Sequence, residues 1–209
     1  MKEPRQARSR ETLRRLLRAA REVIAEDGFE GAAIATIVDR AGVSTGAFYK
    51  RFDSKDGLLH AIHEETVEHN LASMRRTFDP ERWEGKSATA LLEEWIQGSF
   101  QVSRRDAGFQ RACYQCALSD PAFAEREAHL RREAAGLLTG LLLARLPGAR
   151  RREVRESVDF CLTMVTAVVS DVYLSERFPA VAPPLGREAL VKRLMASCSA
   201  QLGLREEGP

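Results

Sequence analysis

The fold is decided by residues 33–52, AIATIVDRAGVSTGAFYKRF. Apolar side chains recur at helical spacing in the first half of this stretch, and Gly42 then allows a sharp reversal of the chain. Ser44 is a good N-cap for a second helix, in which Phe48 and Phe52, four residues apart, point inward. The stretch therefore predicts two short helices, at about 34–41 and 44–52, joined by a tight turn.

The second of these helices carries small and polar side chains on its outward face, which is the arrangement that a helix-turn-helix needs. Short side chains near the helix N-terminus allow it to lie deep in the major groove of DNA, and longer ones at its edge reach phosphates. The alternative is a packed corner of an all-α protein. The outward residues are Thr45, Gly46, Ala47, Tyr49, Lys50 and Arg51.

Residues 9–60 resemble the TetR/AcrR family of transcriptional regulators. The family pattern is matched by Gly28, Phe29, Ile37, Ala41, Gly42, Val43, Ser44, Gly46, Tyr49, Phe52, Lys55 and Leu58. Three family positions differ, because Ala33 stands where a capping Thr is usual, Val38 replaces Ala and Arg51 replaces His. The missing Thr hydroxyl removes a helix cap worth about 0.5–2 kcal/mol.

The resemblance implies which of these residues meet DNA. Tyr49 and Lys55 are expected to contact phosphates, and Arg51 keeps a cation at the phosphate rim. The full set expected at the interface is Thr36, Ser44, Thr45, Gly46, Ala47, Tyr49, Lys50, Arg51 and Lys55. The preceding basic residues, which are Lys2, Arg5, Arg8 and Arg10, form either an arm that enters the adjacent minor groove or a solvated tail.

Strand signals are almost absent, and 3.6-residue periodicity recurs along the chain, so the sequence predicts an all-α fold. A helix-turn-helix DNA-binding domain is expected over residues 1–53, and a helical bundle for ligand binding and dimerisation over residues 54–209. Residues 80–85 are expected to form a loop. The other expected helices lie at about 9–26, 55–77, 87–104, 108–119, 121–146, 151–175 and 186–204.

A homodimer is expected for two reasons. One recognition helix reads only a few base pairs, so a specific site requires a two-fold pair on a palindromic stretch of double-stranded DNA. The last two long helices also carry more apolar surface than one core would use, since residues 151–175 show two adjoining apolar stripes. Val165 and Val168 lie in the middle of the first stripe. Similar proteins pair these two helices with their symmetry mates in a four-helix bundle.

The resemblance also implies a cavity for a small-molecule effector among the mid-chain helices. The candidate wall residues are Trp95, Gln110, Tyr114, Phe160 and Met164, although such side chains usually form core. Because these walls are mostly apolar and no cluster of basic residues lies mid-chain, we expect an apolar or aromatic effector. The predicted activity is that of a repressor which this effector releases from its operator.

Other chemistries are less well supported by the sequence. Cys113 and Cys116 form a single CxxC pair, which is typical of buried core thiols but leaves a thiol-based redox sensor as an alternative. His60, His63 and Glu64 have metal-ligand spacing without a visible fourth ligand. No catalytic constellation stands out, so neither a cofactor nor an enzyme activity is expected. A helical-bundle enzyme or adaptor that does not bind DNA is the rival interpretation.

Charge is distributed unevenly along the chain. Residues 1–55 carry 12 basic and 8 acidic side chains, whereas the remaining residues carry 20 and 22. Only the N-terminal quarter is therefore expected to be attracted to a polyanion. The first ten residues lead into no apolar signal-peptide core, and no apolar run reaches the roughly 20 residues of a membrane span. We expect a cytoplasmic protein with reduced thiols and no membrane partner.

Overall fold

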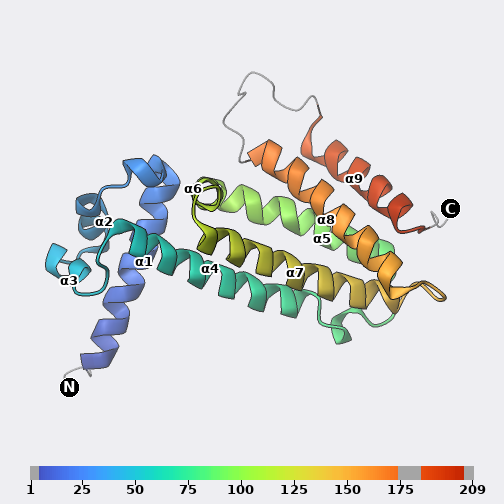
Figure 1. The fold of residues 1–209 in the computed structure, drawn as a ribbon, viewed down its shortest axis with the longest axis horizontal. Helices are drawn as coiled ribbons and strands as arrows, with labels where there is room; N and C mark the ends of the chain where they lie inside the picture. The colour runs from blue at the N-terminus through green and yellow to red at the C-terminus, as the bar shows by residue number, and fades with distance from the viewer. Residues whose placement is uncertain (1–4, 174–184, 205–209) are drawn as a thin grey trace. The chain divides into compact units, whose positions relative to one another are not determined.

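The structure, a computed structural model, describes residues 5–173 and 185–204, and all regular elements in these ranges are helical (Figure 1). The predicted all-α fold is therefore confirmed. The elements in chain order are α1 (Arg5–Gly31), α2 (Ile34–Ala41), α3 (Thr45–Tyr49), α4 (Lys55–Thr77), η1 (Glu81–Trp83), α5 (Ala88–Arg105), α6 (Ala107–Ala117), α7 (Pro121–Leu143), α8 (Arg151–Tyr173) and α9 (Arg187–Gln201).

Most predicted helix bounds agree with the structure to within a few residues, and two predictions differ. The segment predicted as α1 begins earlier, at Arg5, and the helical run continues to Gly31 across an interruption at Gly28. Gly28 has φ of 73° and ψ of 171°, which are values open to glycine and closed to other residues. The stretch predicted as a loop contains the single 3-10 turn η1. The predicted end of the helix at residue 175 lies outside the described residues.

The chain forms two compact units. The first contains residues 1–68 and 106–126, and the second contains residues 69–105 and 127–209. Helix α6 thus belongs with the N-terminal helices, although it lies in the middle of the sequence. Because α4 and α7 each pass a unit boundary, each of them contributes residues to both units.

Helix α6 completes the core of the first unit by lying directly against α1. At Gly108 the two backbones approach so closely that a Cβ atom would overlap the Ala25 carbonyl and lie 2.9 Å from the Ala25 Cα. One turn of α6 around this glycine buries Phe109 and Ala112 in the same core as Val23 of α1. Only glycine at position 108 permits this approach.

Arg21 fastens the same junction by contacts with two further helices. Its guanidinium donates hydrogen bonds to the Asp106 carboxylate at 2.9 Å and to the Thr66 hydroxyl of α4 at 3.0 Å. The guanidinium also lies 4.7 Å from the centre of the Phe109 ring, within the range of a cation–π contact. A single half-exposed side chain of α1 therefore joins α4 and α6.

The second unit is a bundle in which α5 packs against α8 and α9 (Figure 1). Its core combines α5 residues such as Ile96 and Phe100 with Leu138 of α7 and Val165 of α8, all of them buried. Trp83 of η1 is also buried, and its indole N–H donates a hydrogen bond to the Thr77 carbonyl at 2.7 Å. None of the described helices combines the length and apolar character needed to cross a membrane.

We expect Gly108→Ala to destabilise the protein by about 1–3 kcal/mol, because an added methyl group must push α6 away from α1. Gly98→Ala is the matched control: Gly98 lies inside α5, where an added Cβ meets nothing within 4 Å. Chemical denaturation of both variants measures the difference. A Gly108→Ala protein as stable as the Gly98→Ala protein would contradict the close approach.

Candidate nucleic-acid interface

The turn between α2 and α3 is built around Gly42. Its φ of 62° and ψ of 44° place it in the left-handed region, and its N–H closes the end of α2 on the Asp39 carbonyl. Arg15 of α1 donates a hydrogen bond to the Gly42 carbonyl at 3.0 Å. A Cβ at Gly42 would only require the flexible Arg15 guanidinium to move, so it is the left-handed backbone angle that favours glycine at this position.

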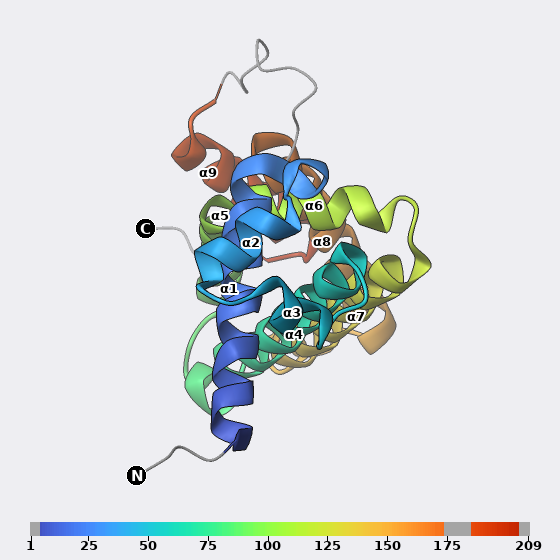
Figure 2. The same ribbon diagram turned by 90° about the vertical axis from the view of Figure 1, so that its left-hand side faces the viewer.

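Helix α3 presents one face and buries the other. The Ser44 hydroxyl caps its N-terminus by accepting the Ala47 N–H at 3.2 Å, and Phe48 is fully buried beneath it. The Phe48 ring contacts the Tyr49 ring edge-on, with 5.2 Å between ring centres, while Tyr49 remains 54% exposed. Thr45, Gly46 and Lys50 are also exposed, and Ala47 is half-buried. Figure 2 shows α2 and α3 beside α1 in the first unit.

Helix α2 begins without the threonine expected at its N-cap. Ala33 occupies the N-cap position in an extended conformation and makes no side-chain cap. Thr36 is exposed in the first turn of α2. At the N-terminus, Arg8 and Arg10 are exposed on α1, and Arg5 begins that helix, whereas Lys2 lies outside the described residues. The predicted basic arm is thus helical from residue 5.

Two cations expected at phosphates have intramolecular partners. The Lys55 ammonium donates hydrogen bonds to the Phe29 carbonyl at 2.7 Å and the Glu30 carbonyl at 3.2 Å, and lies 4.5 Å from the centre of the Phe29 ring. Arg51 donates to the Ala47 carbonyl at 2.8 Å and to the Ser9 hydroxyl at 3.2 Å. Lys55 therefore holds the start of α4 against the end of α1. Arg51 holds the segment after α3 against the beginning of α1.

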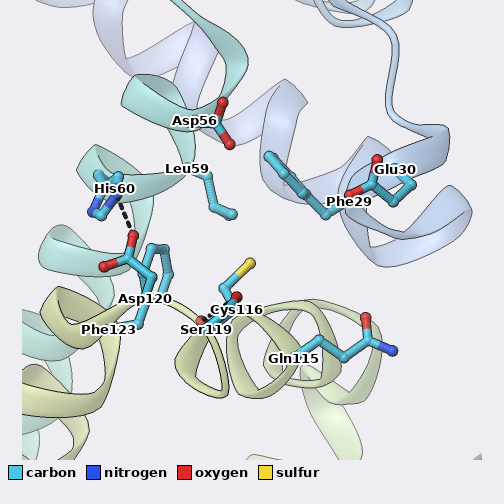
Figure 3. Close-up of a pocket in the computed structure, with 10 residues that line it drawn as sticks. All are labelled: Phe29, Glu30, Asp56, Leu59, His60, Gln115, Cys116, Ser119, Asp120 and Phe123. Atoms are coloured by element: carbon cyan, nitrogen blue, oxygen red, sulfur yellow. Dashed lines mark hydrogen bonds and ion pairs between the residues drawn. The ribbon is translucent and has the colours of Figure 1, made fainter.

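A cavity of about 310 Å³ lies in the first unit (Figure 3). It is lined by the end of α1, by α4 and α6, and by the start of α7. Three carboxylates surround it, from Glu30, Asp56 and Asp120. Figure 3 shows the Cys116 thiol directed into the space and the Gln115 amide pointing away from it. The cavity is therefore an acidic recess around one thiol.

His60 and His63 serve a structural network, which explains their spacing on α4. Arg126 donates to the His60 Nδ1 at 2.7 Å and to the His63 Nδ1 at 3.1 Å, and since arginine only donates, both nitrogens accept. The proton of His60 then lies on Nε2, which is 2.9 Å from the Asp120 carboxylate. The buried His63 ring stacks on Phe123 with 4.4 Å between ring centres.

No three His, Cys, Asp or Glu side chains are grouped as metal ligands among the residues that the structure describes. Sequence reasoning noted the two histidines and missed Asp120 and Arg126, which hold them. The signal was weak, because these partners lie about 60 residues away along the chain and only the fold brings them together.

The cysteines differ from the arrangement that a CxxC sensor requires. Burial, aided by the negative charges of Asp120, Asp56 and Glu30, raises the pKa of the Cys116 thiol, which keeps it in the unreactive protonated form. Cys113 is buried, and neither Cys113 nor Cys116 forms a disulfide. Two other thiols do touch: those of Cys161 on α8 and Cys198 on α9 share a hydrogen bond, which together with burial raises the pKa of Cys198.

The five predicted effector-binding residues divide between the two units. Trp95 is buried in the second unit and Met164 packs beside that core, whereas Phe160 is 54% exposed on α8. Gln110 is half-buried and Tyr114 is 58% exposed, both on α6 of the first unit. None of the five lines the acidic recess.

Comparison with known proteins agrees with this geometry. The family described as "Bacterial regulatory proteins, tetR family" matches residues 16–62. The HTH-type transcriptional regulator YvdT of Bacillus subtilis is 33% identical over 102 residues, which are 48% of this chain and 50% of YvdT. UidR of Escherichia coli K12, also an HTH-type transcriptional regulator, is 35% identical over 74 residues, 35% of this chain and 38% of UidR.

The match to the curated relatives therefore spans about half of their length or less. Among solved structures, GusR of Salmonella enterica shares the fold with a TM-score of 0.64 and 24% identity, over 97% of this chain and 98% of GusR. The helix-turn-helix, its neighbouring helices and these matches define the class of protein. Over residues 16–62 the chain matches the tetR family of bacterial regulatory proteins, and the relatives that match beyond this stretch are HTH-type transcriptional regulators.

The raised pKa of Cys116 predicts slow alkylation by iodoacetamide at pH 8, because little thiolate is present. Asp56→Asn removes one of the negative charges that raise this pKa, so the reaction should become faster. Mass spectrometry of intact protein measures both rates, and Glu22→Gln, on the exposed side of α1, is the control. Equal rates in the wild type and Asp56→Asn would exclude the electrostatic contribution.

Proposed function

We propose that the protein is a homodimeric transcriptional regulator that binds a palindromic operator and, as a repressor, leaves it when a small apolar or aromatic effector binds. The observation that carries this proposal is the geometry of α3. The buried Phe48 ring fixes the helix while Thr45, Gly46, Tyr49 and Lys50 remain exposed on it. In this function residues 1–53 bind DNA, and residues 54–209 bind effector and partner subunit.

The exposed side chains of α3 divide into two roles. Thr45 and Gly46 lie in its first turn and leave little bulk there, so we assign them, with Ala47, to base edges in the major groove. Tyr49 and Lys50, at its other end, are assigned to phosphates. Ser44 and Thr36 are placed at the helix N-termini, where backbone N–H groups favour phosphate. Lys55 and Arg51 keep donors beyond those used within the chain, and these add to the phosphate contacts.

The proposed dimer uses the outer face of α8. Phe160, Met164 and Ala167 are spaced four and three residues apart and so share one side of this helix, where Phe160 and Ala167 are exposed and Met164 is half-buried. Single exposed apolar residues are common on protein surfaces, but an exposed apolar stripe along one helix face is typical of an interface. Val165, in contrast, is buried in the core, and Val168 packs against it.

For an effector to control DNA binding, one structural element must respond to both the effector site and the DNA-binding site. Helix α4 begins at Lys55 in the first unit and ends at Thr77 in the second. An effector that prefers one position of α4 would shift the spacing of the recognition helices away from the 34–36 Å or so between successive major grooves. The two sites are then linked reciprocally, so operator DNA weakens effector binding by the same factor.

The DNA proposal is tested with two lysines. Lys50→Ala should weaken binding to a duplex that the purified protein selects from a random library, and should lower the salt slope by about one, without changing thermal stability. Lys55→Ala should weaken binding and also cost about 1–2 kcal/mol of stability through its lost hydrogen bonds. Fluorescence anisotropy at several salt concentrations provides the data. If no duplex is selected, the rival without DNA binding is correct.

The dimer proposal predicts that Phe160→Glu separates the subunits while each chain stays folded. The reason is that an interface would bury the new charge without a partner. Leu118→Glu is the matched control, since Leu118 is 77% exposed on the first unit. Sedimentation should give twice the chain mass of 23.3 kDa for the wild type and the control, and the chain mass for Phe160→Glu. A dimeric Phe160→Glu protein would place the interface elsewhere.

A further inference from the structure

A second cavity lies within the second unit, and none of the five residues that the sequence indicated for effector lines it. Its volume is about 780 Å³, which is within the range of pockets that enclose drug-sized molecules. One wall is the C-terminal half of α7, with Leu137 and Leu141, and the turn directly after it, with Ala144. The opposite wall is the connection after α4, with Phe78 and Trp83.

Two glycines keep this cavity open. Gly136 and Gly140 are four residues apart and therefore share the face of α7 that lines it. A Cβ atom at either position would meet nothing within 4 Å. A glycine in a helix interior destabilises the helix relative to alanine. Neither glycine has a positive φ, so the backbone conformation does not require glycine at these positions. The effect of the missing side chains is to leave open space.

The walls are held in place by Arg145. Its guanidinium donates hydrogen bonds to the Leu141 carbonyl at 2.6 Å, to the Lys86 carbonyl at 2.9 Å and to the Trp83 carbonyl. The bonds to Lys86 and Trp83 join the segment after α7 to the connection on the opposite side, and the bond to Leu141 returns to α7 itself. The cavity is therefore formed before any ligand arrives, which lowers the conformational cost of binding.

The chemistry of the cavity favours an uncharged molecule. The surface inside it is mostly apolar, from two aromatic and several aliphatic side chains. Four charged residues border it, and their charges balance: Glu81 and Glu84 are acidic, and Lys86 and Arg145 are basic. A carboxylate or an ammonium on the ligand would thus gain little from the rim and lose its hydration.

We propose that this cavity binds an uncharged, apolar aromatic or aliphatic small molecule, and that this molecule is the effector. The second half of this statement rests on the function proposed above. Phe78, which lines the cavity, directly follows α4, and its N–H is bonded to the Met74 carbonyl of that helix at 2.8 Å. A ligand against Phe78 therefore acts on the end of the helix whose beginning carries Lys55.

Binding is tested with two fluorescent probes that differ in one charged group. N-phenyl-1-naphthylamine is uncharged, and 1-anilinonaphthalene-8-sulfonate adds a sulfonate to the same two ring systems. The uncharged probe should bind the full chain saturably, with one molecule per chain, and more tightly than the sulfonate. Equal or tighter binding of the sulfonate would overturn the assignment to an uncharged ligand.

The cavity itself is tested by filling it. Gly140→Leu and Gly136→Leu place side chains in the open space and should weaken binding of the uncharged probe by about tenfold or more. Gly98→Leu adds the same side chain to α5, where the Cβ also meets nothing within 4 Å, and should leave probe affinity unchanged. Leucine is a good helix former, and circular dichroism with thermal melting verifies that each variant is folded.

Unchanged probe binding in both folded α7 variants would overturn the site. Two results together would overturn the proposal in another way: no probe binding by the wild type, and a change of sedimentation in the Gly140→Leu variant. The cavity would then be a contact between copies of the chain. The effector role is tested separately by titrating the uncharged probe on and off the selected duplex. Equal probe affinity of the free and the DNA-bound protein would overturn the effector role, but the cavity would still be a binding site. Failure to select any duplex would overturn the proposed function without affecting the probe experiment.

Discussion

The contact between Gly108 and the backbone of α1 is the constraint on which the first unit depends. Because no side chain separates the two helices at this point, the next turn of α6 carries Phe109 and Ala112 directly into the core around Val23. Arg21 then reaches both Asp106 and α4. The helices that hold the recognition helix are thus positioned by a segment that begins about 60 residues after it in the sequence.

The recognition helix itself has little stability of its own. Helix α3 has five residues, far fewer than an isolated helix needs in water. Its orientation comes from the buried Phe48 ring, from the Ser44 cap and from Arg51, which connects it to α1. Basic residues near the proposed DNA surface therefore have two tasks, since Arg51 and Lys55 organise the scaffold that presents Tyr49 and Lys50.

Local signals made much of this fold predictable from the sequence. Gly42, Ser44 and the spacing of Phe48 and Phe52 act within a few residues, so the helix-turn-helix and the bounds of α2 followed from the sequence directly. The interruption of α1 at Gly28 gave a similar local signal, although the helical run continues beyond it.

The spatial groupings were not predictable in the same way. Trp95 and Phe160 were chosen as cavity walls because they are large, yet one is core and the other is exposed, since burial depends on which helices lie beside each face. The cavity of the second unit was missed because its decisive residues, Gly136 and Gly140, contribute by having no side chain. Periodicity and motif matching depend on the side chains that are present. This pocket depends on two positions where a side chain is missing.

The division of the first unit into residues 1–68 and 106–126 bears on how such a regulator can diversify. The chain passes between the units three times, inside α4, at the link from α5 to α6, and inside α7. A recombination event with a single crossover near residue 68 would bring a new α1 against an old α6, and any bulkier residue at either side of the Gly108 contact would separate them. Under the function proposed above, DNA specificity would therefore be exchanged between relatives more easily by substitutions on the surface of α3 than by replacement of the whole unit.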